Sequence, residues 1–407
     1  MMDNNVLKSI DESIDYAAVK RLMIDLVESP SPQTERLEEE PQVREFIRKT
    51  IEPLLREMGL SDLDYDSMGN LVGRFGENRS GKRLMLVTHA MNHPPATMPD
   101  PYKAKVIDGE EHGLPGEAIL GRGLCEQKAG MAAMLAATRA VLQAGVRLPG
   151  EFLFLTCTSG ETGKHDALRN LIEEKSLQAD LGLIDGSSLK IRLGNRGRLD
   201  IFVTVEGKVS HSGSPHAGAN AITGARLVLD AVEEHVRLPP AHTDVGECTL
   251  TCTHIRSFPD ATHTLQGSCE LTFDRRLLPG EDPDEIFEEF ARIVKTVEET
   301  TDPVSGLPFK VNVQKGPFMY PSLVAEDSQI VRLIKACAAD VLGREPETHY
   351  GKSAFDQGYL NHIGIETANF GPGEDEFAHT DLDMASVQRT YDAARIVARM
   401  LVRYLGD

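Results

Sequence analysis

The stretch "RLMLVTHA", Arg83 to Ala90, is a short apolar run bounded by turn residues, and it is the first of three such runs. The others are "EFLFLTCTS" (151–159) and "LGLID" (181–185). Between the first two runs lies "KAGMAAMLAATRAVLQAG" (128–145), whose apolar spacing predicts an amphipathic helix that starts near Lys128. Short buried strands that alternate with helices are typical of a mostly parallel sheet with helices packed on it. The first half of the chain is therefore predicted to be α/β.

The pattern changes after about Arg196. "RLDIFVTVEGK", "ECTLTCTHIRS" and "GSCELTFDRRL" alternate apolar and polar residues at period two, as in a sheet with one solvated face, and helical stretches accompany them at 219–236 and 283–300. The last third contains two amphipathic helical patterns around the apolar run "GIETANF" (364–370), which restores the first pattern. We therefore predict an α/β domain from 1–196 and 316–407, interrupted by a smaller α+β domain at 197–315.

Composition and charge exclude several classes of protein. The chain has 407 residues, 41% of them hydrophobic, and a formal net charge of -20. Two domains are expected at this length, and nucleic acid and anionic membranes are excluded as partners because both are bound chiefly through clustered Lys and Arg. The six cysteines form no closely paired framework and the polar start is unlike a signal peptide, which favours a cytoplasmic location.

The chemistry-bearing residues fall at the predicted strand ends. In a parallel sheet, ligands gather where the carboxyl ends of the strands meet. Two imidazoles and three carboxylates fall there or in the adjoining loops, a set suited to one or two zinc or manganese ions: His89, Glu126, Glu161, Asp185 and His379. Taken singly, each has an ordinary structural alternative, such as a hydrogen bond to backbone or, for Glu126, a place at the positive end of a helix. Their shared location favours the metal site.

Seven motifs, in order along nearly the whole chain, resemble one metallopeptidase family, that of carboxypeptidase G, acetylornithine deacetylase, succinyl-diaminopimelate desuccinylase and the aminoacylases. They are "THAMNHPP", "PDPYKAKVIDG", "GRGLCEQKAGMAAMLAA", "TSGETG", "GKVSHSGSPHAGANAI", "FDRRLLPGE" and "GKSAFDQGYLNHIGIETANFGPGEDEFAHTDLD". The resemblance implies a metal-binding α/β domain interrupted by a dimerisation lid, and hence a homodimer or a higher homo-oligomer. It implies that the five residues above are the metal ligands, with Glu126 where an aspartate usually bridges two ions.

The resemblance also assigns residues in the predicted lid. His211 matches a histidine that reaches an active site across the dimer, and Asn220, His263 and Arg276 match substrate contacts. Their structural alternatives are turn or helix-cap residues and, for Arg276, a surface ion pair. A planar guanidinium binds a carboxylate through two hydrogen bonds, so Arg276 is the contact that the chemistry favours most.

Two positions depart from the family pattern. Where the family has histidine, any residue and aspartate, this chain has His89, Ala90 and Met91. Loss of a carboxylate that orients a ligand imidazole typically lowers metal affinity or activity by about 10-fold to 100-fold. Where the family has two adjacent glutamates, a general base followed by a ligand, this chain has Gly160 and Glu161. In this alignment the general base is lost; if the alignment shifts by one residue, Glu161 becomes the base and a ligand is lost instead.

Other groups could take over the proton transfer. His93 lies four residues after His89, His165 and Asp166 follow Glu161, and Glu126 is one methylene longer than the residue it replaces. The candidates for catalysis are therefore Glu161, Glu126 and His93. A change from two metal ions to one would free a carboxylate for this role.

These observations predict a metal-dependent hydrolase that cleaves a C–N bond, other than an ordinary peptide bond, in a small carboxylate-bearing substrate. Both amidohydrolases and aminohydrolases fit, including the family branch that removes the aromatic amine of nitroanthranilate, where an electron-poor ring stores negative charge. The alternative, favoured by Met91 and Gly160, is a catalytically silent ligand-binding or regulatory dimer.

Overall fold

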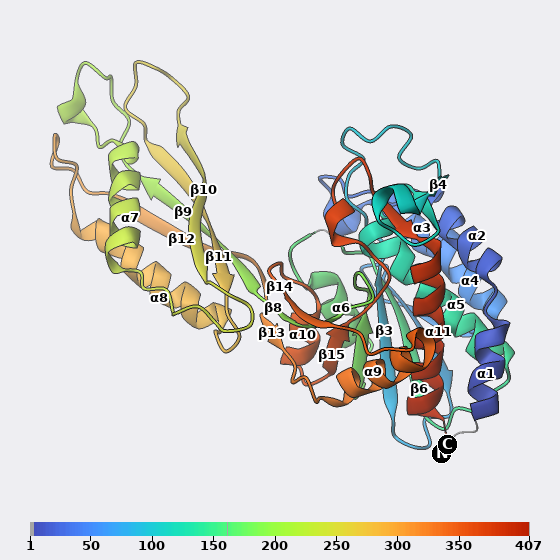
Figure 1. Cartoon of the computed structure of the whole chain (residues 1–407). Helices are drawn as coiled ribbons and strands as arrows, with labels where there is room; N and C mark the ends of the chain where they lie inside the picture. Colours follow the sequence, from blue (N-terminus) through green and yellow to red (C-terminus); the bar gives the residue numbers. More distant parts are fainter. Residues whose placement is uncertain (1–3, 161, 407) are drawn as a thin grey trace. The chain divides into compact units, whose positions relative to one another are not determined.

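The computed structural model describes residues 4–160 and 162–406. It divides the chain into two compact units (Figure 1). The first contains residues 1–194, 323–350 and 359–407, and the second contains residues 195–322 and 351–358. The domain bounds predicted from the sequence, 1–196 with 316–407 and 197–315, stay a prediction.

A nine-stranded mixed sheet forms the centre of the first unit. The pairs β6/β3, β3/β7 and β7/β15 are parallel, whereas β1/β2, β2/β6 and β15/β8 are antiparallel. The predicted α/β class is confirmed, and the three parallel pairs named here join four consecutive strands of the sheet. The spatial order is β1 (Asp62–Tyr65), β2 (Leu71–Gly76), β6 (Glu151–Cys157), β3 (Arg83–His89), β7 (Leu181–Ile184), β15 (Glu366–Asn369), β8 (Ile191–Asn195) and β13 (Ser322–Leu323), and β14 (Thr348–Gly351) pairs with β8.

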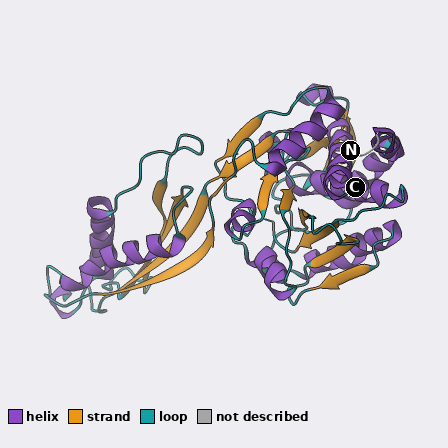
Figure 2. Ribbon diagram, turned by 90° about the horizontal axis from the view of Figure 1, so that it is seen from below, coloured by secondary structure: helices purple, strands orange, loops and turns teal. Residues whose placement is uncertain are grey.

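Helices surround these strands, as Figure 2 shows. The longest two are α5 (Ala129–Gln143) and α11 (Val387–Leu405), which pack on each other and on β3. The others are α1 (Asn4–Ser13), α2 (Tyr16–Val27), α3 (Pro41–Phe46), α4 (Glu52–Met58), α6 (Asp166–Glu174), α9 (Gln329–Leu342) and α10 (Gln357–His362), with single turns η1 (Leu37–Glu39), η2 (Ile47–Ile51), η3 (Gly109–His112), η4 (Leu124–Lys128) and η7 (Asp375–Phe377).

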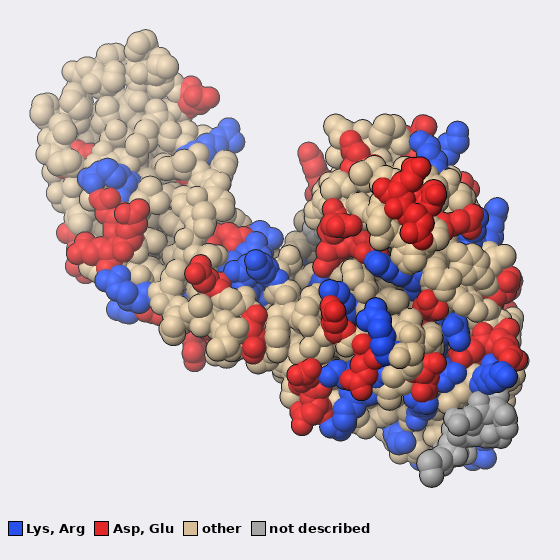
Figure 3. Space-filling view, viewed as in Figure 1, with Lys and Arg blue, Asp and Glu red and all other residues tan. Residues whose placement is uncertain are grey.

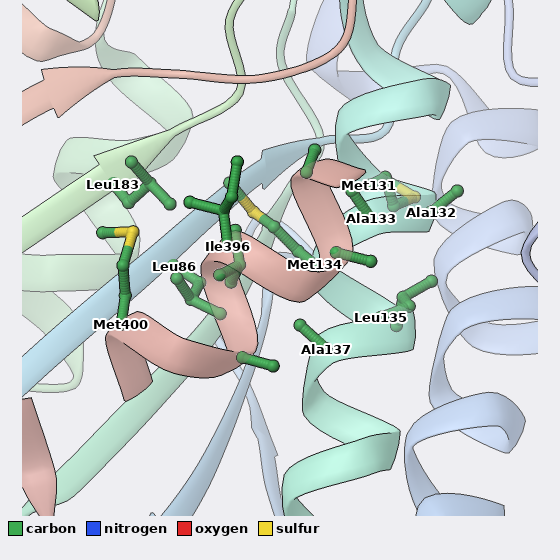
Figure 4. Packing of buried hydrophobic residues seen from close by; sticks show 14 of the residues in the cluster. Leu86, Met131, Ala132, Ala133, Met134, Leu135, Ala137, Leu183, Ile396 and Met400 are labelled. Atoms are coloured by element: carbon green, nitrogen blue, oxygen red, sulfur yellow. The ribbon is translucent and has the colours of Figure 1, made fainter. Parts of the chain in front are cut away.

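The core lies between α5, α11 and the sheet (Figure 4). Small residues such as Ala133 and Ala137 let α5 pack closely on its neighbours α11 and β3, and the side chains of Met131 and Met134 fill the remaining space. Because α5 is buried on nearly all sides, its start is held firmly against the strand ends. A three-stranded sheet of β4 (Lys105–Asp108), β5 (Glu117–Leu120) and β16 (Met384–Ser386) covers a smaller cluster.

The second unit contains a four-stranded antiparallel sheet with its own core. In β11 buried and more exposed residues alternate, as the period-two pattern predicts. The strand order is β10 (Thr249–Phe258), β11 (Ser268–Leu277), β9 (Gly197–Glu206) and β12 (Lys310–Met319), and the helical segments are η5 (Pro215–Ala217), α7 (Ala221–His235), α8 (Pro283–Lys295) and η6 (Thr296–Glu299).

Within the described part of the chain, no helix combines the length and apolarity needed to cross a membrane. All six cysteines are free thiols. On the visible face in Figure 3, Lys and Arg are scattered among Asp and Glu.

Candidate metal centre

His89 and Asp185 lie at the ends of neighbouring parallel strands. His89 is the last residue of β3 and Asp185 directly follows β7. His89 Nδ1 lies 3.5 Å from Asp185 Oδ1, and the two side chains are 12% and 5% exposed. Burial raises the pKa of the Asp185 carboxyl, while the hydrogen bond and the charge of His89 oppose that rise. The second oxygen, Oδ2, is buried without a hydrogen-bond partner among the described residues.

Glu126 and His379 form a second pair. Glu126 lies in η4, and His379 follows η7 in the loop before β16. His379 Nε2 lies 2.9 Å from Glu126 Oε2. The His93 ring stacks on the His379 ring, with the ring centroids 4.1 Å apart and the ring planes at 17° to each other. His379 has a φ of 60°, a conformation that is uncommon outside glycine and often marks a functional constraint.

Close backbone approaches bring the loops of the two pairs together. A Cβ at Gly130, in the first turn of α5, would lie 2.4 Å from Asp185 Cβ. A Cβ at Gly373 would lie 2.0 Å from the carbonyl oxygen of Cys125 and 3.0 Å from that of Gly186. Only glycine fits at these points, so the loop after β7 presses against the first turn of α5, and the loop after β15 presses against η4.

Asp383 holds the η4 loop in place. Its carboxylate accepts hydrogen bonds from the backbone N–H groups of Gly123 at 2.6 Å and Cys125 at 2.9 Å, and it pairs with Arg122 at 3.4 Å. The Cys125 carbonyl accepts a bond from the N–H of Glu374 at 3.1 Å. The peptide before Glu126 is therefore held from both sides.

The two departures from the family pattern meet in space. A Cβ at Gly160 would lie 2.3 Å from the carbonyl oxygen of Met91, and the Met91 N–H donates to the Ser159 carbonyl at 3.3 Å. Met91 is fully buried in the main core. The Met91 backbone thus occupies the space that a side chain at residue 160 would need. Glu161, predicted as a ligand and a catalytic residue, lies outside the described residues.

The predicted lid residues belong to the second unit. The Ser212 N–H donates to the His263 carbonyl at 3.0 Å, which brings the exposed His211 and His263 segments side by side. Asn220 caps α7 by accepting from the Ile222 N–H at 3.1 Å.

Arg276 makes two hydrogen bonds to Asp274, at 2.8 and 3.1 Å. Binding a substrate carboxylate there requires that Arg276 exchange this partner. The substrate-contact roles of the lid residues stay predictions.

Several buried charges near these loops were not predicted, among them three cationic residues and Asp383. Arg122, Lys128, Arg192 and Asp383 are each at most 5% exposed. Lys128 Nζ donates to the Ser29 carbonyl at 3.0 Å, and burial lowers the pKa of Lys128 to about 7. The signal in the sequence was a charge within an otherwise apolar run, as in "KIRLG" (190–194), because buried charges usually require partners.

A cavity of about 470 Å³ lies beside the same loops. Its walls include Ser188 from the loop after Asp185, and Glu374 and Asp375 from the loop before His379, but none of the predicted ligands. Glu374 is paired with Arg389, and burial raises the pKa of the Glu374 carboxyl. This cavity is therefore distinct from the two ligand pairs.

The residues present fit a divalent metal ion. Two ligands of one tetrahedral zinc ion, with bonds of about 2.1 Å, lie roughly 3.4 Å apart, which matches the 3.5 Å between His89 and Asp185. A cation would also satisfy the buried Asp185 Oδ2. Among the described residues no three His, Cys, Asp or Glu side chains already form a ligand cluster. Binding an ion therefore requires the Glu126–His379 pair to open, or a contribution from residue 161.

Comparison with known proteins supports this architecture. A family model described as the peptidase dimerisation domain (M20) matches residues 193–302. N-formyl-4-amino-5-aminomethyl-2-methylpyrimidine deformylase of Halalkalibacterium halodurans is 24% identical, over 86% of each chain.

Two solved structures share the fold. One is the M20 family metallo-carboxypeptidase of Sulfolobus solfataricus, with a TM-score of 0.73, 16% identity and coverage of 95% of this chain and 99% of that one. The other is a dinuclear metal-binding M20 peptidase of Bacillus subtilis, with a TM-score of 0.67, 15% identity and coverage of 96% and 98%.

Proposed function

We propose that this chain, which matches the M20 peptidase dimerisation domain over residues 193–302 and shares the fold of M20 metallopeptidases, is a metal-dependent hydrolase acting on a C–N bond of a small carboxylate-bearing compound. The observation that carries the proposal is the pairing of His89 with Asp185 and of His379 with Glu126 at one edge of the sheet. Asp185 Oδ2, which is buried without a hydrogen-bond partner among the described residues, supports a cation-binding site at that edge.

His89, Asp185, Glu126, Glu161 and His379 would hold the ion in this proposal. A bound divalent ion supplies Lewis acidity, which makes water acidic enough to lose a proton near neutral pH. Zinc and manganese both suit nitrogen and carboxylate ligands. We expect one or two ions per subunit.

Proton transfer is assigned to His93, Glu126 or Glu161, since Gly160 has no side chain. His93 Nδ1 lies 3.0 Å from the Pro94 carbonyl, which can only accept, so Nδ1 carries the proton and Nε2 has the basic lone pair. Glu126 lies against His379 and is 29% exposed, so water can reach it. Such assistance is typically worth about 10²- to 10⁴-fold in rate.

The proposed substrates are amides, formamides or amines other than ordinary peptides. The deformylase similarity supports cleavage of a small formamide. An aminohydrolase acting on a nitroanthranilate-like compound is the other candidate, because an electron-poor ring tolerates an altered proton-transfer apparatus. Arg276, His211, Asn220 and His263 are the proposed substrate contacts. The match to a dimerisation domain supports a homodimer, and we expect a cytoplasmic enzyme.

The test begins with metal analysis of the purified chain. The protein is then loaded with Mn²⁺ or Zn²⁺ and incubated with N-formyl and N-acyl amines and with ortho-aminobenzoates, and released amine or ammonia is measured. Asp185→Asn should lose both the ion and activity. His379→Asn, which tolerates a φ of 60°, should do the same. Asp62→Asn, an exposed residue of β1, is the matched control and should retain both.

Comparing Glu126→Gln, Glu161→Gln and His93→Gln identifies the proton acceptor. The residue whose loss removes activity while leaving the ion bound is the acceptor.

One observation favours a second function. The space at Gly160 is filled by the Met91 backbone, as expected if selection for the general base has been lost. A chain that binds ions and carboxylate ligands but releases no amine from any compound with either metal would be a binding or regulatory dimer.

A further inference from the structure

The cavity of about 470 Å³ in the first unit is lined by none of the residues that the proposed hydrolysis uses. Its volume falls in the range of about 300–1,000 Å³ that is typical of small-molecule sites. The walls come from segments that are far apart in sequence, namely the turn at 113–114, the segment 188–190, Arg344 and Glu347 before β14, and the loop 374–376 with Arg389. The fold therefore builds a second concave site.

Two ion pairs in the cavity wall are satisfied within the protein. Glu374 is paired with Arg389, and Lys190 Nζ lies 2.7 Å from Glu347 Oε2. Glu374 is 4% exposed, and a carboxylate buried to that degree requires a partner. A ligand is therefore recognised by other charges of the wall.

Arg344 and Glu376 are the wall charges that remain for a ligand, since Asp375 lies 3.5 Å from Arg192. Both are exposed, and neither makes a hydrogen bond or an ion pair with another described residue. A guanidinium binds a carboxylate through two parallel N–H donors, and a carboxylate accepts from an ammonium group. A ligand that uses both residues carries one carboxylate and one ammonium group.

The cavity also has an apolar part. Leu114 and Leu189 line it and are 2% and 9% exposed. An aliphatic group that packs on them exchanges water for an apolar surface, which is favourable. The walls thus fit a zwitterion with an apolar side chain, the chemistry of an aliphatic α-amino acid.

The turn at Ser188 and Leu189 is strained. Both residues have left-handed backbone conformations, with φ of 56° and 51°, which are unfavourable for a bulky side chain and cluster at ligand sites. The Ser188 N–H donates to the Gly373 carbonyl at 2.6 Å, and the Leu189 N–H donates to the Gly371 carbonyl at 2.9 Å. The cavity wall thereby joins the loop after β7 to the loop after β15.

The same wall is linked to the candidate metal centre. Ser188 Oγ donates to Glu374 Oε2 at 3.2 Å, and the Glu374 N–H donates to the Cys125 carbonyl at 3.1 Å. Cys125 directly precedes Glu126, and the loop of Glu374 continues to His379. A ligand that holds this loop in place also holds the segments that carry both predicted ligands.

We propose that this cavity is a second binding site, for a small zwitterion of the aliphatic α-amino-acid type, and that its occupation tightens metal binding. The ligand carboxylate pairs with Arg344 and its ammonium group pairs with Glu376. This contact joins the segment before β14 to the loop that leads to His379, so a metal ion binds loops that are already in position. Binding of the zwitterion is independent of the proposed function, whereas the coupling rests on it.

Calorimetry with the full chain tests the site, with L-leucine as the probe. The titration is made with Mn²⁺ present and again after a chelator has removed the metal. L-Leucine should bind at one site per chain in both cases. Its analogues 4-methylpentanoate and 3-methylbutylamine each lack one charge and should bind about 10- to 100-fold more weakly, the typical effect of a hydrogen bond to a charged group.

Four variants locate the bound probe. Arg344→Gln and Glu376→Gln should each weaken L-leucine binding by about the same factor, and both residues are exposed, so the variants should fold. Arg21→Gln, whose side chain is 71% exposed in α2, is the matched control and should bind as wild type. Arg276→Gln, at a proposed substrate contact, should also leave L-leucine binding unchanged.

The coupling is measured as a change in Mn²⁺ affinity. L-Leucine at saturation should lower the Kd for Mn²⁺ about fivefold or more, and Mn²⁺ should tighten L-leucine binding by the same factor, because such coupling is reciprocal. In Arg344→Gln the effect of L-leucine on the Mn²⁺ affinity should disappear.

The outcomes separate the site from the proposed function. The cavity site is overturned if L-leucine does not bind, if either analogue binds as tightly, or if only Arg276→Gln loses binding. L-Leucine binding with an unchanged Mn²⁺ affinity overturns the coupling. A chain that binds no metal ion overturns the proposed function, while L-leucine binding by the metal-free chain still supports the cavity site.

Discussion

Gly160 and Met91 are one structural change and not two. The Met91 carbonyl oxygen lies 2.3 Å from the position of a Cβ at residue 160, and the Met91 N–H donates a hydrogen bond to the Ser159 carbonyl. An aspartate in place of Met91 would be a polar group in the main core, and a glutamate in place of Gly160 would collide with the backbone. Restoring the family residue at either position alone is therefore not expected to restore the family chemistry.

The close contact between Gly160 and the Met91 carbonyl predicts that even a methyl group at residue 160 destabilises the fold. Gly160→Ala should lower the free energy of unfolding by about 1–3 kcal/mol, because an added methyl group overpacks this site. Urea denaturation of the apoprotein measures this loss. Gly213→Ala, where the nearest atom belongs to a side chain 3.1 Å away, is the control and should be affected less. A neutral Gly160→Ala would show that the Met91 segment moves readily.

At the scale of elements, the candidate site depends on loops held together by buried polar contacts. Asp383 joins the segment after His379 to the segment before Glu126, through two backbone N–H groups and Arg122. Strand ends alone would leave these loops mobile. We call these contacts the Asp383 clamp. The clamp holds the separate loops that carry Glu126 and His379 in fixed positions.

Replacing this carboxylate should destabilise the first unit. Asp383→Asn leaves the buried Arg122 without its counter-charge, and breaking such a pair typically lowers stability by about 3–5 kcal/mol. Equilibrium unfolding in urea measures the loss. The control is Asp381→Asn, whose exposed carboxylate accepts from Thr97. Equal, small losses in both variants would contradict the clamp.

The contact between α4 and β1 predicts a pH-dependent effect. Tyr65 Oη donates to Glu52 Oε2 at 2.7 Å, and this bond is the main reason that the pKa of Glu52 is lowered. Since a depressed carboxyl pKa stabilises the fold at higher pH, Tyr65→Phe should remove about 1 kcal/mol near pH 7.

The difference between wild type and variant should be complete above the ordinary glutamate pKa of about 4.3. It should shrink as the pH falls through the lowered pKa of Glu52 in the folded state. Unfolding free energies from pH 3 to pH 7 measure it. In a Glu52→Gln background the pH dependence should disappear; if it persists there, another group is responsible.

At the scale of the whole molecule, the two units have separate cores, and all described candidate ligands lie in the first. A metal ion that binds only the folded first unit should stabilise that unit by about 2.7 kcal/mol at one hundred times the Kd. Calorimetry should therefore show a transition that moves up with Mn²⁺ or Zn²⁺ and down with chelator.

The second unit supplies the internal control for this prediction. Its transition should keep its temperature when metal is added. Equal shifts of both transitions would mean that the units unfold together, and no shift of either would mean that no ion binds.

The sequence by itself determined the periodicities, the fold class and the placement of candidate ligands at strand ends. These features are local, because side-chain alternation and helical spacing are set by neighbours along the chain. His89 and Asp185 could be assigned to one site in advance, since His89 ends one strand and Asp185 directly follows its parallel neighbour.

Only the tertiary structure decided how the site is completed. The Met91–Gly160 contact, the Asp383 clamp, the stacking of His93 on His379 and the burial of Arg192 each join residues from different loops or strands. No local pattern specifies such approaches, because they depend on how far each loop folds back over the sheet. The chain alone therefore showed which residues could act, and the fold decided which of the described ones meet.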